Sequence, residues 1–182
     1  MKFTKYEEFG AYHWRQYEKG TKYKKHADLV KEWVKEKNVL DIGAGDGCIT
    51  ALLGAKGIEN EEVAVRLATE RGADVVLGDA YNLQFPNESF DALLMIDVIE
   101  HFEFPEKALK EAFRVTRNFL YINTPPKRDD GKLTDKFHYQ EWSPEGLMKL
   151  VQSQGFELEG GILVFPNEKT MYAKFKKIHP RF

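Results

Sequence analysis

Short apolar runs alternate with amphipathic stretches along most of this chain. Two of the runs, Asp74–Leu77 and Phe90–Ile96, are almost continuously apolar, which is typical of strands buried on both faces of a parallel sheet. Amphipathic stretches with the helical period separate the runs. This alternation predicts a doubly wound α/β sheet. The predicted parallel strands are Asn38–Ile42, Ala55–Glu59, Asp74–Leu77, Phe90–Ile96 and Phe119–Asn123.

Helix signals lie between these strands. Proline fits best at the first position of a helix, asparagine is a good N-cap, and glycine often follows the last turn. By these signals Asn60 caps one helix and Pro105 opens another. The predicted helices are Thr21–Lys37, Cys48–Leu53, the stretch from Asn60 to Gly72, Pro105–Arg117 and the stretch from Ser143 to Gly155.

The C-terminal part of the chain departs from this alternation. Phe156–Phe165 and Lys169–Ile178 read as two strands, and residues 166–168 between them are short enough for a hairpin. The hairpin adds one antiparallel strand and gives a seven-stranded, mostly parallel sheet. Thr124–Trp142 fits no element, and connections of that length are usually lids, binding loops or disordered segments.

Composition narrows the range of functions. A length of 182 residues favours one domain. The net charge of −2 gives no general attraction for nucleic acid or an anionic membrane. The single cysteine excludes an internal disulfide and a cysteine-based zinc cluster, which fits a cytoplasmic location. No stretch approaches the roughly 20 apolar residues that a membrane span needs.

The strongest motif runs from Asp41 to Gly47. A strand ends in an acid and enters a turn with glycines at positions 43, 45 and 47. Such glycines permit positive φ and close approach of the backbone to a ligand. A strand, such a turn and a helix form the usual site for a nucleotide-like cofactor. The nicotinamide fingerprint needs a glycine at position 48, which is Cys48, so the spacing disfavours a dehydrogenase.

The pattern Asp-x-Gly-x-Gly-x-Gly resembles the first motif of the class I S-adenosylmethionine-dependent methyltransferases. Within that class it is similar to the methyltransferase type 11 family. Further motifs follow in the family's order, and the resemblance extends from Val39 to the C-terminus. It implies a Rossmann-like methyltransferase fold. It also implies a single domain over residues 1–182, with residues 1–37 as a helical cap and 38–182 as the catalytic core. S-adenosyl-L-methionine would be the cofactor and S-adenosyl-L-homocysteine the product.

The resemblance also implies where the cofactor binds. The glycine turn would meet the aminoacyl part, and Asp41 would hold the methionine amino end or tie down nearby backbone. Glu59, at the end of a strand, would accept hydrogen bonds from the ribose hydroxyls, or else is only the first acid of a helix start. Asp79 would accept from the adenine amine, or else is a turn acid. The implied cofactor-binding residues are Asp41, Gly43, Ala44, Gly45, Gly47, Glu59, Asn60, Asp79, Ala80 and Asp97.

Three side chains are candidates for proton transfer from an acceptor, namely Asp97, His101 and His138. For His101 the alternative is a helix-entry histidine that backbone groups satisfy. For His138 it is a loop that packs through its aromatic residues and does no chemistry. The five histidines show no metal-ligand spacing, so no metal site is predicted.

The resemblance implies methyl transfer to an unidentified acceptor. The sulfonium makes the methyl electrophilic, so the protein need only align the acceptor and exclude water. A small molecule is the first expectation for the acceptor, with a protein or tRNA as the others, and the oligomeric state is open. Two other functions are kept as alternatives. One is an aminopropyl transferase of the same fold, and the other is a catalytically silent module that binds S-adenosylmethionine or RNA.

Overall fold

The computed structural model describes residues 4–165 and 169–179. The predicted hairpin joint at 166–168 lies outside the described residues. The chain divides into two compact units, residues 1–80 and residues 81–182, called the first and the second unit below. Within the described ranges, no helix is both long enough and apolar enough to cross a membrane.

The first unit contains three parallel strands in the order β3-β2-β1. They are β1 (Val39–Ile42), β2 (Lys56–Glu59) and β3 (Val75–Leu77). In the register of this sheet, Ile42 lies opposite Ile58, so β1 and β2 end side by side. The turn that follows β1 therefore begins beside the end of β2, where the Gly43 and Ala44 N–H groups both donate to the Ile58 carbonyl at 2.9 Å.

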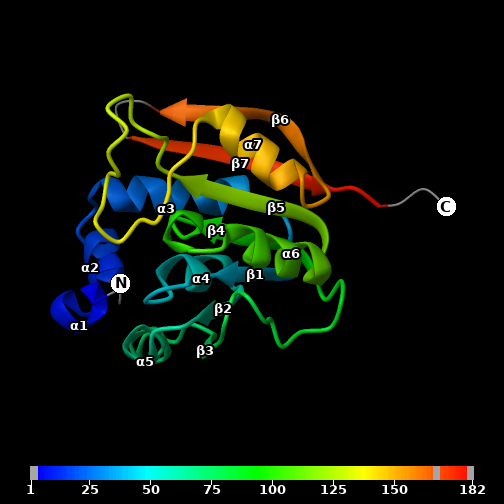
Figure 1. Cartoon of the computed structure of the whole chain (residues 1–182). Coiled ribbons are helices and arrows are strands. Elements are labelled where there is room, and N and C mark those ends of the chain that lie inside the picture. The colour runs from blue at the N-terminus through cyan, green and yellow to red at the C-terminus, as the bar shows by residue number, and fades with distance from the viewer. Residues whose placement is uncertain (1–3, 166–168, 180–182) are drawn as a thin grey trace. The chain divides into compact units, whose positions relative to one another are not determined.

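The helices of the first unit pack against one another, and α5 also packs against two of these strands. Figure 1 shows α5 beside β2 and β3, and the N-terminal helices in blue. The short α4 follows the glycine turn and matches the predicted helix at both ends. The five helices are α1 (Lys5–Phe9), α2 (Tyr12–Glu18), α3 (Lys22–Trp33), α4 (Cys48–Leu53) and α5 (Glu62–Glu70).

Two predicted helix bounds in the first unit are wrong. Helix α3 ends at Trp33 and not at Lys37, because Val34 is already extended and leads the chain into β1. Asn60 does not cap α5. Glu61 is the N-cap residue and makes no side-chain cap bond, because the carboxylate of Glu59 accepts the N–H groups of both residues 60 and 61.

The second unit contains four strands in the order β4-β5-β7-β6. Strands β4 and β5 are parallel, whereas β7 is antiparallel to both β5 and β6, so the predicted antiparallel pair is confirmed. In Figure 1, α6 lies beside β5 and α7 beside β6. The elements are β4 (Phe90–Ile96), η1 (Ile99–His101), α6 (Pro105–Val115), β5 (Thr116–Thr124), α7 (Pro144–Gln152), β6 (Phe156–Phe165) and β7 (Thr170–Lys177).

The start of β5 differs from the prediction. The strand begins at Thr116, where the sequence favoured helix to Arg117 and a strand only from Phe119. Tertiary partners hold these polar residues in extended conformation. The Lys177 ammonium donates to the Thr116 carbonyl at 2.8 Å, and Arg117 pairs with Asp91 at 3.0 Å. Local helical propensity is overridden by these contacts.

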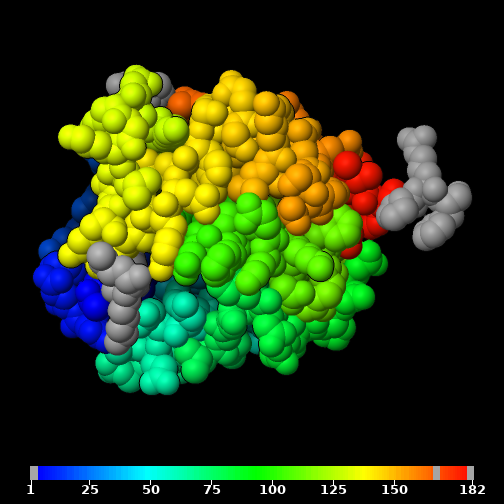
Figure 2. Space-filling model, in the orientation of Figure 1, coloured from blue at the N-terminus to red at the C-terminus, as the bar shows by residue number. Residues whose placement is uncertain are grey.

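The long segment between β5 and α7 is an irregular loop, as predicted. Its base is closed where the Lys127 N–H donates to the Trp142 carbonyl at 2.8 Å. Residues 127–134 are exposed and form the yellow-green lobe in Figure 2. Phe137 is buried, whereas Tyr139 is 46% exposed. The loop therefore packs through one of its aromatic residues but not through Tyr139.

Candidate functional site

The glycine turn of the first unit needs glycine at each of its three alternating positions. Gly43, Gly45 and Gly47 have φ values of 73°, 57° and 76°, a region that side chains disfavour. A Cβ on Gly47 would lie 2.6 Å from Ala73 Cβ and 2.8 Å from Ala68 Cβ. Close packing thus adds to the backbone requirement at the third glycine.

The carboxylate of Glu59 closes this turn from the side of β2. One oxygen accepts the Gly45 N–H at 2.9 Å, and the other accepts those of Asn60 at 2.8 Å and Glu61 at 3.1 Å. Burial raises the pKa of Glu59, and these backbone donors oppose the rise. The side chain therefore links the glycine turn to the start of α5, so it is more than the first acid of a helix start.

Asp41 lies buried within β1. Its carboxylate accepts the Thr50 hydroxyl at 2.6 Å, which ties the strand to the first turns of α4. Burial raises the pKa of Asp41 to about 7, against the lowering effect of this hydrogen bond. The expectation that Asp41 ties down its neighbours agrees with this contact, although the partner is a side chain rather than the backbone.

Two residues missed by sequence reasoning join the N-terminal helices to the glycine turn. Asp46 is fully buried; its carboxylate accepts the His13 N–H at 2.9 Å, and its carbonyl accepts the Trp14 indole N–H at 2.7 Å. The Tyr6 hydroxyl lies against Gly45 and occupies the place where a Cβ would stand. An acid between two glycines was the available signal for Asp46; nothing local marked Tyr6.

Asp79 and Ala80 follow β3 in the same unit. Asp79 is exposed and Ala80 is half-buried. The turn that carries them begins beside Glu59, because the Gly78 N–H donates to the Glu59 carbonyl at 2.9 Å. The first unit thus gathers its candidate cofactor residues at the carboxyl ends of three neighbouring strands.

In the second unit, polar residues follow the end of β4. Asp97 is exposed and has a positive φ of 50°, a conformation that aspartate tolerates better than most residues. Its N–H donates to the Asn123 carbonyl at 2.9 Å. Glu100 is only 1% exposed and accepts the Thr124 hydroxyl at 2.8 Å. Burial, followed by the charge of Asp97, raises the pKa of Glu100 well above its ordinary value.

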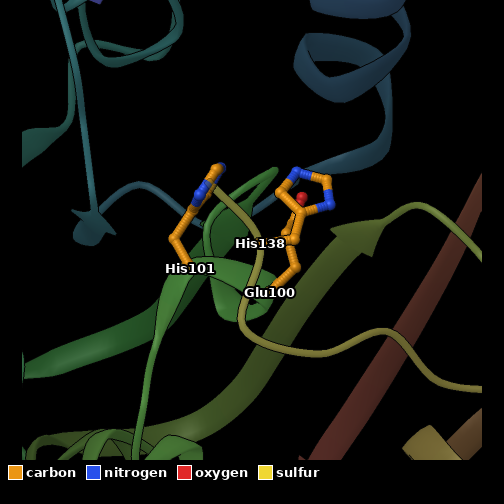
Figure 3. A group of neighbouring side chains, drawn as sticks. All are labelled: Glu100, His101 and His138. Carbon is orange, nitrogen blue, oxygen red and sulfur yellow. The ribbon is translucent and has the colours of Figure 1, made fainter. Parts of the chain in front are cut away.

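His101 and His138 meet although they come from η1 and from the long loop. Figure 3 shows both rings, with Glu100, projecting to the same side of the ribbon. The two ring centroids are 4.7 Å apart in an edge-on arrangement. His101 Nδ1 lies 3.1 Å from the Phe137 carbonyl, so one nitrogen of this ring is satisfied by the backbone, as the alternative interpretation expected.

Glu141 holds the second ring. Its Oε1 lies 2.7 Å from His138 Nδ1 and accepts the Thr134 N–H at 2.7 Å and hydroxyl at 2.6 Å. Burial works to raise the pKa of Glu141, but the hydrogen bonds from Thr134 and His138 outweigh it and lower the pKa. The described residues also include one group with the donors to hold a metal ion, formed by Glu100, His101 and His138.

Comparisons with known proteins indicate similarity to methyltransferases. A family model described as a methyltransferase domain matches residues 40–119. The demethylmenaquinone methyltransferase of Thermotoga maritima is 30% identical over 140 residues, which are 68% of this chain and 60% of that protein. The chain spans 47%, 60% and 55% of the length of three curated relatives that it matches.

Solved structures share the fold. One from Thermotoga maritima is described as an S-adenosylmethionine-dependent methyltransferase and possible histamine N-methyltransferase. It superposes with a TM-score of 0.70 at 27% identity, over 83% of this chain and 87% of that one. The magnesium protoporphyrin IX methyltransferase of Synechocystis PCC 6803, solved with bound S-adenosylhomocysteine, gives 0.68 at 16% identity, over 84% and 82%. The predicted α/β fold is confirmed.

Proposed function

The chain belongs to the class I S-adenosylmethionine-dependent methyltransferases, and we propose that it transfers a methyl group from S-adenosyl-L-methionine to a small-molecule acceptor. The observation that carries this proposal is the glycine turn of the first unit, which the Glu59 carboxylate closes through the Gly45 N–H. S-adenosyl-L-methionine is the cofactor of this family. For each part of this cofactor, the methionine, the ribose and the adenine, the first unit has a candidate binding group at the carboxyl ends of its strands.

The proposed cofactor contacts follow the strand ends in order. The backbone from Gly43 to Gly47 and Asp41 take the methionine part. Glu59 takes the ribose hydroxyls, since each carboxylate oxygen can accept more than one hydrogen bond and the backbone already orients both oxygens. Asn60 lies beside the ribose, and Asp79 with the Ala80 N–H takes the adenine edge.

The N-terminal helices are the proposed cap of this site. We propose residues 1–37 as the cap and residues 38–182 as the catalytic core of one domain. The contacts of Tyr6 with Gly45 and of His13 with Asp46 support a cap over the glycine turn. Helix α1 would then have to adjust when the methionine part of the cofactor binds beside Gly45.

The reaction needs little covalent chemistry from the protein. The acceptor atom forms its bond to the methyl carbon while the carbon–sulfur bond breaks, and sulfur keeps the electron pair. Alignment and exclusion of water supply most of the rate. A hydroxyl or amine acceptor also loses a proton, and the proposed proton acceptors are Asp97, His101 and His138.

A small molecule is the proposed acceptor. The relative from Thermotoga maritima is named for demethylmenaquinone, and the structural neighbour for histamine. The net charge of −2 provides no general attraction for RNA. The cytoplasmic location stays a prediction from the single cysteine.

Titration calorimetry on the purified chain tests the proposal. We expect micromolar binding of S-adenosylmethionine and S-adenosylhomocysteine, no binding of NAD(H), and loss of binding in Glu59→Ala and Asp79→Ala. Asp74→Ala is the matched control. This exposed acid precedes β3, at the end away from Asp79, and pairs with Lys56 of β2. Absence of binding in folded, ligand-free protein would overturn the cofactor assignment.

A labelled-methyl screen then separates the other functions. Small molecules, protein extract and tRNA are offered in turn, and we expect label in the small-molecule fraction. Label in protein or tRNA would replace the acceptor class. Binding of the cofactor without transfer to any of them would indicate a silent module, and transfer from decarboxylated S-adenosylmethionine would indicate an aminopropyl transferase.

A further inference from the structure

We propose that Glu100, His101 and His138 of the second unit form a binding site for one divalent transition-metal ion. Each of these side chains offers a ligand atom, and the three atoms all lie within 4.8 Å of one another. Figure 3 shows the carboxylate and the two imidazoles gathered on one side of η1 and the long loop. The site shares His101 and His138 with the proposed methyl transfer, but the binding test below reads the metal directly and does not depend on that activity.

In both rings Nδ1 faces a hydrogen-bond acceptor, which assigns Nε2 as the nitrogen that would bind a metal. The Phe137 carbonyl next to His101 Nδ1 can only accept, so this nitrogen carries the proton, and in the neutral ring Nε2 carries the lone pair. Glu141 does the same for His138 at 2.7 Å. Metal-binding histidines typically donate their other N–H to a carboxylate or a backbone carbonyl, and this pair has one of each.

The carboxylate is also held in place. The Thr124 hydroxyl donates to one oxygen of Glu100 at 2.8 Å, which orients the side chain. The Tyr139 N–H donates to the Glu100 carbonyl at 2.9 Å, and this bond fastens the loop to η1. Because His138 precedes Tyr139, the same bond places the second imidazole beside the other two ligands.

The donor set selects the ion. Two imidazoles and one carboxylate suit Zn²⁺, Fe²⁺, Co²⁺ or Mn²⁺, whereas Ca²⁺ and Mg²⁺ prefer oxygen ligands alone. Tetrahedral ligands about 2.0–2.2 Å from Zn²⁺ stand roughly 3.4 Å apart, so small side-chain rotations would close the group on an ion. Three protein ligands leave one position open for water or an oxygen donor.

The sequence predicted no metal site because His101 and His138 show no local ligand spacing. The long loop brings them together, and we infer a site that only the fold creates. With an ion bound, both imidazoles act as ligands, and an ion-bound water becomes the group that exchanges protons there.

The test uses the full chain after removal of metals with a chelator. Calorimetry with Zn²⁺ and visible absorption with Co²⁺ are measured on wild type, on the double variant His101→Gln/His138→Gln, on Glu141→Gln and on the control His179→Gln. His179 is exposed and its ring contacts the Arg117 carbonyl. Circular dichroism checks that each variant is folded.

We expect one Zn²⁺ per wild-type chain and a Co²⁺ spectrum without a thiolate band, since the single cysteine, Cys48, is buried in the first unit. The double variant should lose binding, His179→Gln should keep it, and Glu141→Gln should weaken it about 10–100-fold as a positioning residue. No stoichiometric binding by wild type would overturn the proposal. Equal binding by a folded double variant would also overturn it. If the double variant does not fold, the wild-type Co²⁺ spectrum decides. A thiolate band in that spectrum, or the absence of any Co²⁺ absorption, would overturn the proposal.

Discussion

Each unit has buried carboxylates near the carboxyl ends of its strands, but the two units hold these carboxylates with different hydrogen-bond partners. In the first unit, Glu59 is satisfied mainly by backbone N–H groups of the glycine turn and of the start of α5. In the second unit, the carboxylates of Glu100 and Glu141 are satisfied mainly by side chains, namely threonine hydroxyls and an imidazole. Backbone conformation therefore shapes the first group, and side-chain contacts across a long loop shape the second.

This difference determines which substitutions should be harmful. The first unit should lose stability when a side chain is added to the glycine turn or when the carboxylate that accepts its backbone N–H groups is removed. Loss of a single hydrogen-bonding side chain should damage the cluster of the second unit.

The largest effect is expected at the third glycine of the turn. Gly47→Ala places a Cβ 2.6 Å from Ala73 Cβ and forces a side chain into the left-handed region, which together should cost about 4 kcal/mol of unfolding free energy. Gly54→Ala is the control, because Gly54 has a φ of 63° and nothing within 4 Å. It should cost only about 1 kcal/mol. Urea unfolding measures both, and equal losses would contradict the packing argument.

Asp41 should make stability depend on pH. Its folded pKa of about 7 exceeds the unfolded value near 3.8, so the folded state binds more protons between these values. Its contribution to stability is therefore fully present below the unfolded pKa and lost as pH rises through 7.

Between pH 5 and pH 8 this loss should amount to about 3 kcal/mol. Unfolding free energies measured across that range should fall more steeply for wild type than for Asp41→Asn, which cannot titrate. Parallel profiles for the two proteins would show that the Asp41 pKa is not raised.

In the second unit, Glu141→Gln should cost about 2 kcal/mol, because charge-assisted bonds to His138 and Thr134 are replaced by weaker ones in a buried place. Glu145→Gln, at an exposed acid in the first turn of α7, is the matched control and should stay within about 0.5 kcal/mol of wild type. Denaturant unfolding measures both. If Glu141→Gln left the free energy of unfolding unchanged, side-chain contacts would not be what holds this cluster together.

The smallest effect is expected where the N-terminal helices meet the turn. Trp14→Phe removes the indole N–H that donates to the Asp46 carbonyl at 2.7 Å and should cost about 1 kcal/mol. Hydrogen exchange should become faster in α1 and α2 while β1 stays protected. Unchanged exchange in both helices would show that this bond does not hold the cap.

The same contrast explains how far the sequence could predict the structure. Apolar runs, glycines and Pro105 marked most strands and helices, because these signals are local. Asn60 was wrongly predicted as a cap because the Glu59 side chain takes over that role. The start of β5 was missed because Lys177, distant in sequence, holds Thr116.

The candidate sites follow the same rule. The glycine turn and Glu59 could be found because the turn follows a strand directly and Glu59 ends the next one. The meeting of His101 with His138 could not, since the loop that joins them carries no periodic pattern. Tyr6 was missed because its contact with Gly45 depends on how α1 packs against the turn.

The most direct test of the central claim is hydrogen exchange of the full chain with and without S-adenosylhomocysteine. We expect slower amide exchange in the glycine turn, residues 43–47, and after Glu59, because the ligand would bind against these backbone groups. Slower exchange elsewhere, with these amides unchanged at saturating ligand, would contradict a cofactor site in the first unit.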